Sequence, residues 1–82
     1  MATDKTEPLH FRRIDPTRNM ARFYSLSLQP TLFGELSLVR NWGRIGTEGR
    51  GMIETFSAPA EAEKARRRME RIKHRKGYRE TE

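Results

Sequence analysis

One aromatic side chain in the sequence stands among cations in a pattern that suits binding to a polyanion. Trp42 is the only tryptophan, and Arg40 and Arg44 flank it at two positions on either side. An indole ring can stack on a sugar or a base, and guanidinium groups pair with phosphates. Gly43 beside the ring would let a sugar or backbone approach closely. The alternative is that Trp42 anchors the core and both arginines are solvated, and composition alone favours that interpretation.

A second group of cations follows near the C-terminus. Residues 57–79 carry nine basic and three acidic side chains, in a chain whose formal net charge is +6. Arg67, Arg71 and Arg75 lie on adjoining helical turns and could follow a phosphate backbone. The alternative is a solvated helix face that keeps a small domain soluble. A sequence pI of about 10.5 favours a polyanionic partner, most often nucleic acid.

The sequence offers little for other kinds of chemistry. It has no cysteine, which excludes disulfides, thiolate catalysis and cysteine-based zinc sites. His10 and His74 are single, and neither stands in a metal-ligand spacing. The glycines at 46, 49 and 51 lack the Lys-Ser/Thr ending of a phosphate-binding loop. We therefore expect a protein that is not an enzyme, with no catalytic residue, no cofactor, no metal and no small-molecule substrate.

Four strands and one helix would position these residues. The strands are expected over residues 9–14, 21–29, 35–45 and 50–56. The second is the clearest, since Tyr24, Leu26 and Leu28 alternate with serines, and the third carries the tryptophan. Leu32 and Phe33 lie in the connection between these two strands, and their apolar character predicts a loop that is pinned against the core.

The helix is predicted over residues 58–76. Ser57 is the expected N-cap, and Gly77 is the expected stop. Apolar residues recur at spacings of three and four and would face the sheet, namely Ala62, Ala65, Met69 and Ile72. The order of elements predicts an α+β fold, a small antiparallel meander of about four strands with one C-terminal helix packed across a face.

The length of 82 residues predicts a single domain. We expect a flexible N-terminal tail at residues 1–8, the domain at 9–78 and a short C-terminal tail at 79–82. The sequence has no apolar run long enough to span a membrane and no signal peptide. These features predict a cytoplasmic protein, which we expect to be a monomer.

The residues around the tryptophan also resemble a known family. Trp42-Gly43-Arg44, within residues 38–46, is similar to the tripeptide that names the WGR domain. The resemblance extends from Leu9 to Tyr78. Its other supports are Arg22-Phe23-Tyr24, Leu32-Phe33-Gly34, Thr47, Gly49, Ala62, Lys73 and Lys76-Gly77-Tyr78.

The resemblance implies a small antiparallel sheet with one packed helix, and a role in binding DNA. WGR domains occur in DNA-damage-responsive poly(ADP-ribose) polymerases, where they bind DNA near break ends and signal to the catalytic domain. By resemblance, Trp42 would stack on the sugar of a terminal nucleotide, and Arg44 would contact DNA or a neighbouring domain. Compact bacterial proteins also resemble this chain, and its short tails lead us to expect a stand-alone domain without a transferase.

The sequence as a whole predicts a small, non-catalytic nucleic-acid-binding module. The expected partner is double-stranded DNA near ends or nicks. The predicted contact residues are Trp42, Arg44, Arg40, Arg67, Arg71 and Lys73. The alternative function is an adaptor that docks on a separate protein through the Trp42 face.

Overall fold

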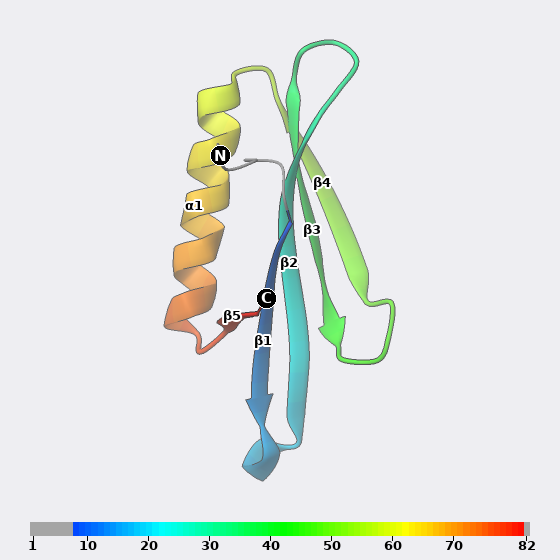
Figure 1. The fold of residues 1–82 in the computed structure, drawn as a ribbon, viewed down its shortest axis with the longest axis vertical. Coiled ribbons are helices and arrows are strands. Elements are labelled where there is room, and N and C mark those ends of the chain that lie inside the picture. Colours follow the sequence, from blue (N-terminus) through cyan, green and yellow to red (C-terminus); the bar gives the residue numbers. More distant parts are fainter. Residues whose placement is uncertain (1–7, 82) are drawn as a thin grey trace.

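Alternating apolar and polar residues build an antiparallel sheet in residues 8–81, the part of the chain that the computed structural model describes. The strands are β1 (Leu9–Asp15), β2 (Met20–Pro30), β3 (Leu36–Arg44), β4 (Arg50–Phe56) and β5 (Arg79–Thr81). They lie side by side in the order β4-β3-β2-β1-β5, and helix α1 (Pro59–Arg75) runs along one face of the sheet (Figure 1). A short 3-10 turn (Pro16–Arg18) joins β1 to β2. The predicted α+β fold, an antiparallel sheet with one helix across it, is confirmed.

The described part of the chain has one strand more than the sequence predicted. Arg79–Thr81 was assigned to a C-terminal tail, but it pairs antiparallel with residues 10–12 of β1. Three residues are too few to show a periodic pattern, so no sequence signal marked this strand. Of the predicted N-terminal tail, only Pro8 lies within the described residues, and it is exposed.

The core lies between the sheet and α1. Its buried residues are Phe11, Tyr24, Leu26, Leu28, Leu38, Ala62 and Tyr78. The register places Tyr24, Leu26 and Leu28 on the face that α1 covers, as their alternation predicted. From the predicted helical stripe, Ala62 is fully buried, Ala65 and Met69 pack against the core, and Ile72 is half-buried. Full burial of a leucine side chain, such as that of Leu26, contributes about 1.5–3 kcal/mol to folding.

The two ends of α1 differ in how they are capped. Ala58, and not the predicted Ser57, is the N-cap, and its side chain offers no capping hydrogen bond because it has no oxygen. At the C-terminal end, Gly77 has a φ of 95°, which its missing side chain permits. The Gly77 amide donates to the His74 carbonyl at 3.1 Å, and the Tyr78 amide donates to the Lys73 carbonyl at 2.9 Å. This Schellman motif confirms the predicted stop and turns Tyr78 back into the core.

The loop between β2 and β3 does not pack against the core as predicted. Leu32 and Phe33 are 98% and 86% exposed at the tip of the hairpin. The turn satisfies its own backbone, because the Thr31 hydroxyl accepts hydrogen bonds from the amides of Phe33 and Glu35, each at 3.2 Å. Gly34 completes the turn with a φ of 81°. The apolar character of Leu32 and Phe33 therefore did not mean that these side chains are buried.

The turn between β3 and β4 brings two backbones into direct contact. Gly49 has a φ of 71°, and a Cβ at this position would overlap the Trp42 carbonyl oxygen and lie 2.8 Å from Cζ of Phe23. A Cβ on Gly43 would lie 2.7 Å from Cα of Gly49. Both separations are shorter than real Cβ contacts, so the hairpin closes in this form only with glycine at both positions.

Candidate nucleic-acid interface

Trp42 lies on the face of β3 that α1 covers, because it pairs with Tyr24 of β2, whose ring is buried. The Trp42 ring stacks on the Tyr24 ring at a centroid distance of 6.3 Å and an interplanar angle of 27°. Trp42 is half-buried and packs against the core cluster. Trp42 therefore supports the core and leaves part of its side chain at the surface, and its role in binding stays a prediction.

Trp42 also lines an open hollow of about 320 Å³ at the end of the sheet near the C-terminus of α1. The other residues of this Trp42 hollow are Arg22, Gly43, Arg44, Lys73 and Tyr78. Arg22 and Arg44 are directly opposite each other on β2 and β3. Two like charges in a cross-strand pair repel each other, so an anion bound between them would relieve the repulsion.

Lys73 enters the hollow from α1 and lies among aromatic rings. Its ammonium nitrogen is 4.3 Å from the Tyr24 ring centroid and 5.1 Å from the Tyr78 ring centroid. Burial lowers the pKa of Lys73, and the positive charges of Lys76, Arg40 and Arg22 lower it further. The rings favour the cation through their negative faces. Among the described residues that line the hollow none is acidic, so an anion bound there would supply a counter-charge.

Tyr24 links the rings beneath the hollow. It contacts Tyr78 at a centroid distance of 6.2 Å in an edge arrangement, in addition to its stacking on Trp42. Burial raises the pKa of the Tyr24 hydroxyl, and the nearby Arg40 charge offsets part of that rise. Arg40 is thus close enough to act on the hydroxyl electrostatically. Within residues 8–81, however, neither the hydroxyl nor Nε of Arg40 has a hydrogen bond of ordinary geometry.

Arg40 itself belongs to a second hollow, of about 270 Å³, between β3, β4 and the N-terminal half of α1. The residues of this Arg40 hollow are Leu38, Arg40, Glu54, Phe56, Glu61, Lys64, Ala65, Arg68 and Met69. The Arg40 guanidinium lies 5.8 Å from the Trp42 ring centroid. It also donates to the sulfur atoms of Met69 and Met52. Arg40 is therefore held next to the Trp42 ring, between the two hollows.

The structure brings only part of the predicted site together. Trp42, Arg44 and Lys73 line one hollow, and Arg40 lies beside it. Arg67 and Arg71 are exposed on α1 and line neither hollow.

Sequence reasoning missed Arg22 and Tyr78 as members of the hollow. Arg22 is two residues from Tyr24 and therefore points to the same face of the strand. The predicted pairing of this strand with the strand of Trp42 could have placed it beside Trp42. Tyr78 could have been found from the stop at Gly77.

The comparisons with known proteins agree with this architecture. The family model described as WGR domain matches residues 7–82. The chain is 45% identical over 71 residues to the uncharacterized protein y4dW of Sinorhizobium fredii (strain NBRC 101917 / NGR234). The matched stretch covers 87% of this chain and 35% of that protein. It also resembles a protein of Bacteroides fragilis with a known crystal structure, at a TM-score of 0.80 and 30% identity, over 93% of this chain and 20% of that one.

The chain spans about a third of the curated relative and a fifth of the solved chain. Within residues 8–81, the helix is too short and too polar to cross a membrane. A WGR match over nearly the whole chain supports a nucleic-acid-binding module in general terms. On this match, the chain belongs to the WGR domain family.

Proposed function

We propose that this WGR domain is a non-catalytic, monomeric module that binds double-stranded DNA at ends or nicks through the Trp42 hollow. The observation that carries the proposal is the lining of the hollow, where Arg22, Arg44 and Lys73 surround the Trp42 and Tyr78 rings. Among the described residues that line it, none is acidic. Guanidinium and ammonium groups would hold phosphate oxygens, and the indole would stack on a nucleotide.

The preference for ends or nicks follows from the position of the ring. Trp42 is half-buried on a sheet face and cannot reach between stacked base pairs. It can contact only a sugar or base whose face is already free, and a duplex offers such a face where a strand terminates. Arg22 and Arg44 lie opposite each other on neighbouring strands and would hold the adjoining phosphates.

The remaining predicted residues would act around this contact. Arg40 would hold the Trp42 ring in place through its cation–π contact and its hydrogen bonds to the methionine sulfur atoms. Arg67 and Arg71, exposed on α1, would attract phosphates farther along the duplex and add affinity without sequence preference. Arg44 would contact DNA directly.

A second candidate function is docking on a separate protein across the Trp42 face. The Arg40 hollow favours it, because its apolar floor contains Leu38, Phe56 and Met69 and charges of both signs surround that floor. A hollow of this kind suits a partner's apolar anchor inside a polar rim. Such binding would depend weakly on salt, which separates it from phosphate binding.

The deciding experiment is a binding titration at two salt concentrations against blunt duplex, nicked duplex, closed circular duplex and single strand. We expect the blunt and nicked duplexes to bind most tightly, and all affinities to fall as salt rises. If the closed circular duplex binds as tightly as the blunt and nicked duplexes, the domain does not recognise ends or nicks. Absence of binding at low salt would contradict DNA binding itself and favour the protein partner.

A further inference from the structure

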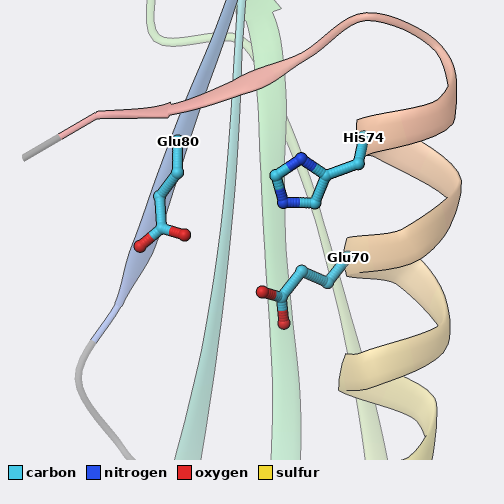
Figure 2. A group of neighbouring side chains, drawn as sticks. All are labelled: Glu70, His74 and Glu80. Atoms are coloured by element: carbon cyan, nitrogen blue, oxygen red, sulfur yellow. The ribbon is translucent and has the colours of Figure 1, made fainter.

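Three side chains that take no part in the Trp42 hollow converge near the C-terminal end of α1. Figure 2 shows Glu70 and His74 extending from α1 toward Glu80, which extends from β5. The ligand atoms that these three residues offer all lie within 4.8 Å of one another. Glu70 and His74 are one helical turn apart and so share a face of α1. The helix and the fifth strand thus supply one imidazole and two carboxylates to a single point.

The buried Phe11 side chain positions two of these groups. Its ring meets the His74 ring edge-on, at a centroid distance of 5.5 Å and an interplanar angle of 85°. Phe11 is also the register partner of Glu80 in the pairing of β1 with β5, which places Glu80 on the side of the sheet that faces α1. Because Phe11 is only 1% exposed, it anchors the backbone positions that carry His74 and Glu80 to the core.

We propose that Glu70, His74 and Glu80 form a binding site for a divalent transition cation, most suitably Zn²⁺. Zinc accepts imidazole nitrogen and carboxylate oxygen at about 2.0–2.2 Å, whereas Ca²⁺ and Mg²⁺ prefer oxygen ligands throughout. The ligands of a tetrahedral zinc ion lie roughly 3.3–3.5 Å apart. His74 and Glu80 are exposed, so their side chains are free to close the remaining distance. Water would complete the coordination.

The surrounding charges determine how tightly such an ion is held. The two carboxylates balance the charge of a dication. Arg66 opposes it, because its Nη1 atom forms an ion pair with Oε1 of Glu70 at 3.3 Å. The second oxygen of Glu70 can bind the ion without breaking this pair. An exposed site with a competing cation would be a moderate binder and not a structural zinc site on which folding depends.

Ion binding at this point would join α1 directly to β5. The segment between Glu70 and Glu80 holds the helix stop and also Lys73 and Tyr78 of the Trp42 hollow. β5 has three residues and lies at the edge of the sheet, so it is held by few backbone hydrogen bonds. A chelate across this segment would therefore reduce the opening of β5.

The test is calorimetric titration of the metal-free chain with zinc sulfate in a buffer that does not chelate metals. We expect one saturable site in the parent. His74→Phe keeps a ring against Phe11 but removes the ligand nitrogen, and Glu80→Gln keeps the side-chain length. Each should weaken zinc binding at least tenfold, because loss of a supporting residue alone costs roughly 10- to 100-fold at a metal site. Melting curves without zinc would establish that both variants fold.

His10→Ala is the matched control, because His10 is an exposed histidine on the opposite face of the sheet. It should bind zinc as the parent does. Zinc should also slow amide hydrogen exchange in residues 79–81 of the parent but not of His74→Phe. The proposal is overturned if the parent shows no saturable binding, if His74→Phe binds as tightly as the parent, or if His10→Ala removes the site.

Discussion

The Trp42 hollow and the Arg40 hollow meet on one face of β3, where their two namesakes are separated by a single residue. Among residues 8–81, three cationic side chains line each hollow. In the Arg40 hollow, Glu54 and Glu61 stand among these cations, whereas the described lining of the Trp42 hollow contains no carboxylate. Neighbouring charges of opposite sign cancel at short range. A high content of arginine and lysine therefore does not by itself make a phosphate site.

The uncharged parts of the two linings differ as well. The Trp42 hollow has the two flat rings of Trp42 and Tyr78, while the Arg40 hollow has one ring, that of Phe56, beside the aliphatic side chains of Leu38 and Met69. Flat rings can stack on nucleotides, and aliphatic side chains cannot. Variants that alter one hollow and spare the other therefore test whether DNA recognition belongs to the first alone.

The largest expected effect comes from removing all three cations of the Trp42 hollow. If Arg22, Arg44 and Lys73 each contact one phosphate, their combined change to alanine should flatten the slope of log affinity against log salt by about 2.7. The measurement is fluorescence anisotropy of labelled blunt duplex over a series of salt concentrations. Lys64→Ala with Arg68→Ala, which alters the Arg40 hollow, should leave the slope close to that of the parent. Equal slopes in the two sets would place DNA binding elsewhere.

The second-largest expected effect is a loss of DNA affinity when the Trp42 ring is removed. Trp42→Ala should weaken binding to a blunt duplex roughly 5- to 150-fold, which corresponds to a stacking contribution of about 1–3 kcal/mol. Phe56→Ala is the matched control, since Phe56 is a half-buried ring of the Arg40 hollow that also packs on the core. Both should lose stability, by less than the roughly 3–5 kcal/mol of a fully buried ring. If both variants lose affinity equally, the loss reflects the fold and not stacking.

A smaller effect is expected outside both hollows. Arg67→Ala and Arg71→Ala should each flatten the salt slope by about one unit if the side chain contacts a phosphate. Both residues are exposed on α1, so melting should not change. Slopes identical to the parent would restrict the DNA contact to the Trp42 hollow and leave these arginines as a solvated helix face.

The smallest effect concerns pH. Burial and neighbouring cations lower the pKa of Lys73, so it loses its proton at a lower pH than an ordinary lysine, whose pKa is about 10.4. Only the protonated form attracts phosphate, so DNA affinity should fall as pH rises through that lowered pKa. Lys73→Arg remains charged and should hold its affinity at alkaline pH. A parent and variant that lose affinity in parallel would exclude Lys73 as the cause.

The lowered pKa of Lys73 also determines whether folding stability rises or falls with pH. Well below the folded pKa of Lys73, both the folded and the unfolded chain carry a protonated Lys73, so folding bears the full cost of burying the charge. As pH rises above the lowered folded pKa, the folded state releases its proton first, and the contribution of Lys73 to stability increases. In Lys73→Arg this increase should be missing from the pH dependence of melting.

The predictions from sequence succeeded where a local pattern was long enough to carry the signal. The alternation of Tyr24, Leu26 and Leu28 located the central strand, and the spacing around Ala62 located the helix. The prediction failed at Leu32 and Phe33, because an apolar side chain in a turn can face solvent when the turn satisfies its own backbone. Ser57 failed as the N-cap because the helix begins one residue later than its hydroxyl required.

The candidate site was less predictable than the fold because its members meet through register and not through sequence spacing. Arg22 and Arg44 became neighbours only when β2 paired with β3. Glu70 and His74 are four residues apart within the predicted helix, but their meeting with Glu80 depended on a strand too short to predict. The arginine pattern around Trp42 indicated a binding face but could not say which cations share it.

The contact between Gly49 and the Trp42 carbonyl has a consequence for how this protein can evolve. A shift of one residue between β3 and its neighbours would turn Trp42 to the other side of the sheet and bring Asn41 in its place. The close approach at Gly49 is compatible with one alignment of the hairpin, so it acts against that shift. Mutational drift can therefore change many surface residues of the binding face while its orientation is kept. That orientation is inherited through Gly49, a residue that has no side chain with which to touch a ligand.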